Sequence, residues 1–392
     1  VMSTSKQSLI LAKYGLNGSR KKVGVNFWRF LFTGINTINN SEQCFLVELE
    51  LLNPTENPNE CVLGYTPKVH VSPQDLQYAL TGNNDSIDLT GEKILTPTYA
   101  VIRICKLGKN SKQLCTYLPV NKLSFSNKPF KVESGNKLFS ENRINGFINI
   151  DEAELLDHPE YFCESGYASW NLNYEVEASK VNGYSQNNEK WIPYGLLAKF
   201  EGSVNFDGVE YTVNYQKSCG YVDRFWSKTF PQTWFHISSS NLVSLISGKP
   251  LLKSGFAVQG IFNNKLSLIC NFEEIELDFC AQKNDTQYTV VWNCSQLSKE
   301  HEESDERLHW TVSVTSKDWI IDLDVFCSIK ELYNRNLEYP DGKRDLLNVV
   351  QSGNATGEIK LYKNTKKSIE QIEYAKIVSA FCEYGLKEEY QS

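Results

Sequence analysis

The sequence predicts a mainly β protein with antiparallel strands. Apolar and polar residues alternate along several short runs, as expected where one face of a strand is buried; the clearest are 45–51, 200–204, 209–215, 311–316 and 320–326. Turn signals such as Asn182-Gly183 and Asp207-Gly208 separate runs of this kind. The strands recur about every ten residues, which is typical of a barrel or sandwich rather than of βαβ units.

Two segments have a helical pattern instead. Residues 151–157 begin with acidic side chains, which favour the first turn of a helix. In residues 368–386, Ser368 is a candidate N-cap, and the apolar residues that follow can share one helix face; these are Ile369, Ile372, Ala375, Phe381 and Tyr384. The sequence therefore predicts one short helix and a longer C-terminal helix.

A chain of 392 residues is too long for one ordinary hydrophobic core, so we expect two domains. Residues 179–189 are rich in Asn, Ser and Gly and separate two strand-rich halves. We place one barrel in residues 1–185 and a second barrel, with the terminal helix, in residues 190–392. Each half is long enough for one closed or nearly closed antiparallel barrel.

Composition and charge argue against several classes of protein. The formal net charge is −7 and no basic stripe occurs, so nucleic acid is not an expected partner. No apolar run approaches the length of about 18 residues that a bilayer-spanning helix needs, and the first residues lack the apolar stretch of a signal peptide. The eleven cysteines include no C-x-x-C pair, which is typical of reduced thiols. We therefore expect a cytoplasmic protein.

The sequence predicts no cofactor and no metal site. It contains none of the glycine-rich phosphate or dinucleotide motifs, and neither a zinc-protease motif nor a nucleophile elbow. His301 and His309 flank an acidic stretch, but their spacing fits no known metal site. We interpret that stretch as a solvated loop between strands.

Residues 220–241 hold the densest group of reactive and aromatic side chains in the chain. Phe230-Pro231 separates two strand-like runs, so the segment is predicted to form a hairpin or corner. In the second run Trp234 and His236 share one face, and Asn241 ends the strand.

The first run, GYVDRFWS at 220–227, places an acid and a guanidinium side by side. Because side chains alternate along a strand, Asp223 and Arg224 must lie on opposite faces. Tyr221 shares the face of Asp223, whereas Trp226 shares the face of Arg224. Only one of these faces can line a cavity, and the alternation does not say which.

From Trp191 onward the chain resembles the tocopherol cyclase-like family. The similarity lies in WIPYG at 191–195, EGSVNFDGVEY at 201–211, GYVDRFW at 220–226 and FPQTWF at 230–235, followed by Asn241. Ser227 stands where the family has glycine. Weaker similarity is found in FWRFLF at 27–32 and SWNL at 169–172. The resemblance implies two lipocalin-like antiparallel β-barrels that meet around an apolar cavity.

The resemblance also implies an activity, that of a cofactor-independent cyclase or isomerase of a hydrophobic, prenylated small molecule. Such an enzyme protonates a carbon–carbon double bond, which needs an acid kept protonated by a dry site, and aromatic faces that shelter the cation. Asp223 or His236 is the expected acid and Arg224 the anchor of a substrate oxygen. The expected walls of the site are Tyr221, Trp226, Phe230, Trp234 and Asn241. The expected ligand is a prenylquinol, terpenoid or lipid, and we also expect peripheral contact with a membrane.

An alternative assignment turns Arg224 and Trp226 inward. Arginine stays protonated at any physiological pH, so it would hold an anion such as a phenolate, an enolate or a carboxylate. The related carotenoid hydratases have, by resemblance, a histidine where this chain has Arg224 and an acid on a following strand. Residues 254–258 carry no acid, so hydration is disfavoured.

Structural roles remain open for each of these residues. Trp226 and Trp234 can be core aromatics, Asp223 and Arg224 can close a barrel mouth, and His236 can be an ordinary hydrogen-bonded strand residue. Two other functions are therefore kept beside the cyclase. One is a non-catalytic carrier of a lipid or terpenoid, and the other is an interaction protein whose barrels are filled by their own side chains.

Overall fold

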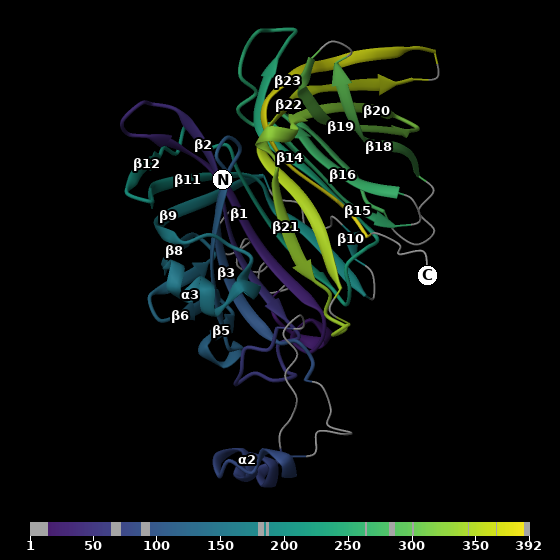
Figure 1. The fold of residues 1–392 in the computed structure, drawn as a ribbon. Coiled ribbons are helices and arrows are strands. Elements are labelled where there is room, and N and C mark those ends of the chain that lie inside the picture. The colour runs from purple at the N-terminus through teal and green to yellow at the C-terminus, as the bar shows by residue number, and fades with distance from the viewer. Residues whose placement is uncertain are drawn as a thin grey trace.

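Figure 1 shows the chain as a computed structural model, in which almost all regular structure is strand. The structure describes residues 15–63, 72–87, 95–178, 184–185, 188–262, 265–281, 287–299, 302–343, 345–365 and 367–387. The prediction of a mainly β protein is confirmed.

A first antiparallel sheet of 13 strands lies in the described part of residues 25–227. Its strands are β1 (Val25–Asn36), β2 (Glu42–Leu52), β3 (Tyr99–Leu107), β4 (Lys112–Leu118), β5 (Ser124–Asn127), β6 (Phe130–Ser134), β7 (Lys137–Ser140), β8 (Arg143–Ile150), β9 (Gly166–Ala178), β10 (Tyr184–Ser185), β11 (Glu189–Phe206), β12 (Val209–Val213) and β13 (Gly220–Ser227). They are ordered β4-β3-β2-β1-β12-β11-β9-β8-β7-β6-β5, with β10 beside β11. β13 lies between β1 and β11 and pairs with both.

A second antiparallel sheet of 10 strands occupies the rest of the described chain. Its strands are β14 (Thr233–Ser244), β15 (Gly255–Phe262), β16 (Lys265–Phe272), β17 (Ile275–Phe279), β18 (Tyr288–Lys299), β19 (Glu302–Ser316), β20 (Trp319–Ser328), β21 (Tyr333–Glu338), β22 (Leu346–Asn364) and β23 (Ile369–Leu386). They are ordered β17-β16-β15-β14-β23-β22-β20-β19-β18, and β21 pairs with β22. Together the two sheets form a closed barrel and a half-barrel.

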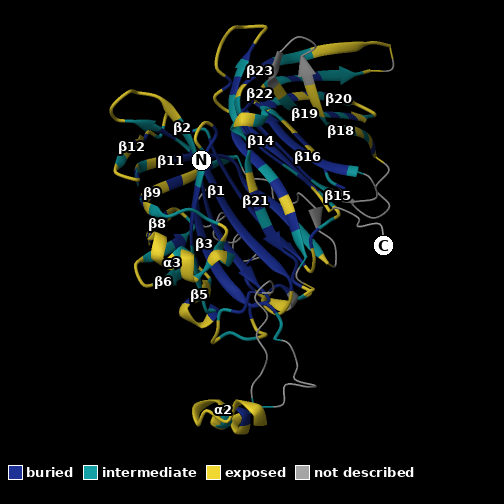
Figure 2. Cartoon of the chain, viewed as in Figure 1, coloured by how far each residue is buried: buried dark blue, intermediate teal, exposed yellow. Residues whose placement is uncertain are grey.

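The apolar side chains form three buried clusters. One fills the interior of the first sheet and contains many aromatic rings, among them Trp28, Phe30 and Phe200. A second fills the interior of the second sheet around Trp310. The third lies between the sheets and joins Tyr221 and Phe225 of β13 to Trp234 of β14. Figure 2 shows the result, with the strands where the two sheets meet buried and the outer loops exposed.

β13 is buried along its whole length because both of its faces are covered. Val222 points into the interior of the first sheet, whereas Tyr221 and Phe225 point into the cluster between the sheets. A strand covered on both sides has no face exposed to solvent. Both Asp223 and Arg224 are therefore buried, one on each side.

The predicted short helix is confirmed as α3 (Glu152–Asp157), whose N-cap Asp151 accepts a hydrogen bond of 2.8 Å from the backbone N–H of Glu154. A second helix, α2 (Pro73–Leu80), was not expected from the pattern and lies away from both sheets in Figure 1. Single 3₁₀ turns complete the helical structure at Gly18–Lys21, Asn84–Ser86, Val120–Lys122, Pro159–Tyr161 and Ile329–Glu331. No helix of the described residues is both long and apolar enough to cross a membrane.

The predicted C-terminal helix is wrong. Residues 369–386 form β23, which hydrogen-bonds to β14 on one side and to β22 on the other. Ladders on both sides satisfy the backbone groups that a helix would have paired internally. Ala375 and Ile377 are buried on alternate positions, a spacing that the helical interpretation overlooked.

The chain passes from the first sheet to the second between Ser227 and Thr233. The polar segment at 179–189, parts of which lie outside the described residues, was the predicted boundary. In the structure β10 and β11 on either side of it belong to the first sheet. The division into folding units at 185–190 stays a prediction, but the hydrogen-bonded sheets divide after β13.

The strand assignment of residues 369–386 predicts opposite effects for adjacent positions. Ile377 is fully buried, whereas Val378 on the other face is 39% exposed. Replacing Ile377 by Ala should lower the free energy of unfolding by about 2–5 kcal/mol, because a cavity opens in a packed core. Val378→Ala, the matched control, should change it by no more than about 0.5 kcal/mol. Urea unfolding measures both, and similar losses at the two positions would contradict the strand.

Candidate functional site

A row of charged side chains runs across four neighbouring strands of the first sheet on the face toward the second sheet. The register places Arg29 of β1 opposite Asp223 of β13 on one side and opposite Glu48 of β2 on the other. Glu48 in turn lies opposite Arg103 of β3. Opposite charges thus alternate from strand to strand, and all four side chains are at least 95% buried.

Arg29 binds Asp223 with both arms of its guanidinium. Nε donates to Oδ1 at 2.8 Å and Nη2 donates to Oδ2 at 2.5 Å. The same carboxylate oxygen Oδ2 accepts from the Tyr221 hydroxyl at 2.8 Å and from the Trp191 indole at 2.9 Å. Every oxygen of this buried carboxylate is therefore hydrogen-bonded, as a buried charge requires.

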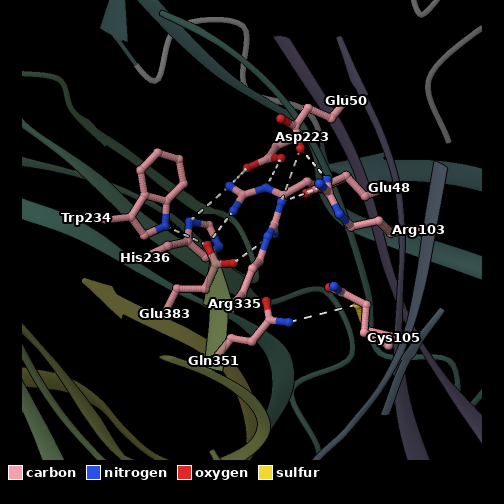
Figure 3. A network of polar contacts seen from close by, with 12 residues as sticks. Glu48, Glu50, Arg103, Cys105, Asp223, Trp234, His236, Arg335, Gln351 and Glu383 are labelled. Carbon is pink, nitrogen blue, oxygen red and sulfur yellow. Dashed lines mark hydrogen bonds and ion pairs between the residues drawn. The ribbon is translucent and has the colours of Figure 1, made fainter. Parts of the chain in front are cut away.

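Arg29 also reaches across the interface into the second sheet. Nη1 donates to Oε2 of Glu383 on β23 at 2.8 Å, and Nη2 donates to Oε1 of Gln259 on β15 at 2.6 Å. Trp234 on β14 donates to the same Glu383 oxygen at 2.8 Å. Figure 3 shows side chains of both sheets converging, among them Asp223 from the first sheet and Glu383 and Trp234 from the second. A single guanidinium thus connects the two sheets.

A second arginine, Arg335 on β21, strengthens this connection. It pairs with Glu48 of the first sheet and lies 3.6 Å from Oε1 of Glu383. Arg103 pairs with Glu48 at 3.0 Å and also with Glu50. The network therefore holds three guanidiniums and four carboxyls. Burial raises the pKa of Glu383, although Arg29 and Arg335 oppose that shift; a proton on Glu383 would make the network electrically neutral.

The environment of Asp223 does not suit the predicted role of proton donor. Burial favours the neutral carboxyl, but the charge of Arg29 and its hydrogen bonds outweigh burial and lower the pKa of Asp223 below its usual value. Asp223 is therefore ionised at neutral pH. Its partners hold the negative charge in place, so it has no proton to deliver to an alkene.

His236 is neutral and fixed. Gln259 Oε1 accepts from Arg29, so it must also accept from Nδ1–H of His236, which lies 2.7 Å away. Nε2 is then the acceptor for the Ser238 hydroxyl at 3.1 Å. Burial and the nearby Arg29 lower the pKa of His236 to about 3. In this state the imidazole links Gln259 to Ser238 by hydrogen bonds.

A small cavity of about 30 Å³ lies between the sheets, and its lining includes Tyr221, Ser238 and Phe381 but neither Asp223 nor His236. This is room for one or two water molecules, whereas ligand pockets measure about 300–1,000 Å³. The predicted acids therefore do not border a ligand-sized space.

Arg224 has a different environment, in the interior of the first sheet. The register places it between Trp28 of β1 and Ile192 of β11, two members of the interior cluster. Its guanidinium carbon lies 3.7 Å from the centre of the Trp28 ring. Nη2 donates to Oδ1 of Asn26 at 2.5 Å and Nη1 donates to the carbonyls of Phe27, at 3.2 Å, and Phe225.

Arg224 has no carboxylate partner among the described residues, although it is 99% buried. All of its hydrogen-bond acceptors are uncharged, and Nε has no partner there. Burial and the neighbouring Arg20 lower the pKa of Arg224 well below its usual value. The positive charge of Arg20 therefore repels that of Arg224, which lies in an apolar interior.

A short N-terminal segment, residues 15–21, covers this end of the sheet. The side chain of Leu16 joins the interior cluster, and its backbone N–H donates to Oδ1 of Asn127 at 3.1 Å. Asn26 donates to the carbonyl of Arg20 at 3.0 Å, so one amide contacts both Arg20 and Arg224. Leu16 is therefore part of the interior cluster, and Arg20 is linked to Arg224 through Asn26.

The structure separates the other predicted site residues. Trp226 is buried and donates to the carbonyl of Val23 at 3.1 Å. Phe230 and Trp234 pack edge-to-face in the cluster between the sheets. Asn241 donates to the Ser379 hydroxyl at 2.9 Å at an irregularity between β14 and β23. These aromatic side chains therefore pack in the protein interior, Asn241 lies apart from them, and their predicted place in one site stays a prediction.

No group of three or more His, Cys, Asp or Glu residues suited to a metal ion occurs among the residues described. His309 pairs with Asp324 and stacks on Phe326 at 4.1 Å. His301 lies outside the described residues.

The sequence interpretation assigned no site role to Arg29, Glu48, Glu50, Arg103, Arg335 and Glu383. Each of the first four is a charged residue inside an otherwise apolar strand, for example Arg29 in FWRFLF and Arg103 in AVIRIC. An isolated charge in an apolar strand signals a buried pair, since an unpaired buried charge is costly. Which residue pairs with such a charge depends on strand register, and an isolated charge in the sequence does not reveal the register.

Comparisons with known proteins do not establish a family. No family model matches the chain, and no curated protein matches it either. Among solved structures, an AttH protein from Nitrosomonas europaea is 9% identical, with 96% of each chain covered and a TM-score of 0.46. Kievitone hydratase from Nectria haematococca is 15% identical, with 93% of this chain and 89% of that chain covered and a TM-score of 0.42. Similarity at this level carries no argument, and membership of the tocopherol cyclase-like family stays a prediction.

Removing the central guanidinium should destabilise the protein strongly. Arg29→Met leaves Asp223 and Glu383 buried without their shared partner, a loss of about 3–5 kcal/mol in the free energy of unfolding. Lys131→Met is the control, because the Lys131–Glu133 pair is 44% exposed on both sides and should contribute no more than about 1 kcal/mol. Equal effects in chemical denaturation would contradict the central role of Arg29.

His236 should make stability depend on pH. The pKa of His236 is about 3 in the folded state and ordinarily 6.5. Between these two pH values the unfolded chain therefore binds a proton at His236 and the folded protein does not. The contribution of His236 is complete above pH 6.5 and is lost as the pH falls toward 3, by up to about 1.4 kcal/mol per pH unit. The stability difference between the wild type and His236→Asn should shrink from about pH 7 to about pH 5 in urea unfolding. A constant difference would show that His236 titrates alike in both states.

Proposed function

We propose that the protein binds an amphipathic small molecule with an acidic head group, which Arg224 holds inside the first sheet. The observation that carries this proposal is the guanidinium of Arg224, which is buried in an apolar interior with no carboxylate partner among the described residues. This function corresponds to the non-catalytic carrier of the sequence analysis. It keeps the predicted classes of ligand, since a phenolate or carboxylate head occurs in prenylated phenols, terpenoid acids and fatty acids.

Electrostatics support an anion at this position. A buried charge without a counter-charge costs several kcal/mol, and in proteins it is normally paired. Arg20 adds a second positive charge close enough to lower the pKa of Arg224. An oxyanion between the two guanidiniums would relieve their repulsion and supply an acceptor for the unpaired Nε of Arg224.

The surrounding side chains suit the apolar part of such a ligand. Trp28 and Phe130 stack at 6.0 Å near the guanidinium, and Trp28 also contacts Phe125. Aromatic walls provide a large apolar surface. Leu16 occupies this end of the interior, so we propose that the apolar chain of the ligand replaces Leu16 when it enters.

Acid-initiated ring closure has weaker support. It requires a protonated acid beside a cavity large enough for the substrate. Asp223 is held ionised by Arg29, His236 is neutral, and the small cavity between the sheets measures about 30 Å³. Binding by Arg224 needs no proton donor, and for that reason we favour it over the cyclase.

A paired set of ligands tests the head-group anchor. We expect laurate to bind more tightly than dodecanol, with a change in tryptophan fluorescence because Trp28 stacks on Arg224. Arg224→Met should weaken laurate binding about 10- to 100-fold, as expected for the loss of a charged hydrogen bond of about 1.5–3 kcal/mol. Dodecanol binding should change little.

The control is Arg143→Met, since Arg143 is exposed on β8 and hydrogen-bonds Asn171 at 3.1 Å. Its laurate affinity should equal that of the wild type. Circular dichroism of both variants verifies that the fold is retained. Equal affinity for laurate and dodecanol in the wild type, or equal laurate affinity in Arg224→Met, would refute the anchor.

A further inference from the structure

A cleft of about 510 Å³ opens on the outside of the first sheet, where it meets the second. One wall comes from β9, β11 and the turn after β12, and the other from the loop before β15 and from β16 with the turn that follows it. The volume falls within the usual range of small-molecule sites, about 300–1,000 Å³. The cleft is separate from Arg224, which faces the interior of the first sheet.

A buried lysine lines this cleft. Lys199 on β11 is 8% exposed and has no ion-pair or hydrogen-bond partner among the described residues. Its neighbours Ala198 and Phe200 point into the interior cluster, so Lys199 lies on the outer face of the strand, toward the second sheet. A lysine in this position is suited to hold an anionic group of a ligand.

The opposite wall carries a buried amide with a free acceptor. Asn271 on β16 is 7% exposed, and its Nδ2 donates to the carbonyls of Lys253 at 2.7 Å and Glu273 at 3.2 Å. These two bonds fix the orientation of the amide, and Oδ1 has no partner among the described residues. A ligand N–H or O–H group would satisfy this oxygen.

The rim of the cleft has a net negative charge, because its three glutamates outnumber Lys253, whose Nζ lies 4.0 Å from Oε1 of Glu274. Glu273 and Glu274 are exposed on the wall formed by the second sheet, and Glu177 lies on the other wall, where the Tyr215 hydroxyl donates to it at 3.3 Å. Carboxylates at the rim attract a cationic group. The cleft therefore has a buried cation inside and an excess of carboxylates at its mouth.

We propose that this cleft binds a small zwitterion of the amino-acid type with an apolar side chain. The carboxylate lies on Lys199, the ammonium faces Glu273 and Glu274 and donates toward Asn271, and the side chain lies against Leu197 and Leu252, which also line the cleft. Each charged end of the ligand meets the opposite charge, and the apolar residues lie between them.

Three probes of similar size test the proposal by calorimetry. L-Phenylalanine should bind, whereas 3-phenylpropanoate, which lacks the ammonium, and phenethylamine, which lacks the carboxylate, should each bind at least about tenfold more weakly. Lys199→Met should weaken L-phenylalanine binding at least about tenfold and leave phenethylamine binding unchanged. The double variant Glu273→Gln/Glu274→Gln should also weaken L-phenylalanine binding, but it should leave the binding of 3-phenylpropanoate, which has no ammonium group, unchanged.

Lys217→Met is the matched control, because Lys217 is an exposed lysine close in sequence to the cleft residues Tyr215 and Gln216. Its affinity for L-phenylalanine should equal that of the wild type. Absence of L-phenylalanine binding in the wild type would overturn the proposal. Unchanged binding in Lys199→Met, with its fold verified by circular dichroism, would overturn it as well.

Discussion

The ion pair between Arg29 and Asp223 is the interaction on which the rest of the structure depends. It lies between β1 and β13 of the first sheet, and the same guanidinium holds Glu383 and Gln259 of the second sheet. Buried charges are expensive unless every partner is in place. The two sheets therefore cannot shift relative to one another without breaking the contacts of Arg29 with Glu383 and Gln259. This requirement selects one relative position, which apolar contact alone would specify less sharply.

The same pair determines what each face of β13 can do. Asp223 on one side is fully occupied and helps to hold the sheets together, whereas Arg224 on the other side has only uncharged acceptors. A residue whose hydrogen bonds and charge are satisfied has little left to offer a ligand. The unsatisfied residue is therefore the better indicator of a binding site, and this moves the expected chemistry from proton donation toward anion binding.

Much of the fold was predictable from alternation and turn signals. The opposite orientation of Asp223 and Arg224 was also correct, because alternation holds wherever a strand is regular. The C-terminal helix was wrong because residues 369–386 contain apolar residues at both spacings, and pairing with β14 and β22 decides between them. The charged residues at the interface were missed, because Arg29 lies 194 residues from Asp223 and 354 residues from Glu383 along the sequence. Contacts at that separation depend on strand order and register, which local patterns do not contain.

β23 has a consequence for the order in which the chain can fold. It is the last described strand, yet it lies between β14 and β22 and carries Glu383. A ribosome makes the chain from its N-terminus, so the whole first sheet and nine strands of the second emerge before this carboxyl does. Until then Arg29 has Asp223 but lacks Glu383, and β14 has an open edge. Nascent chains that stall before residue 369 would expose that edge, which is the kind of surface that chaperones and proteases recognise.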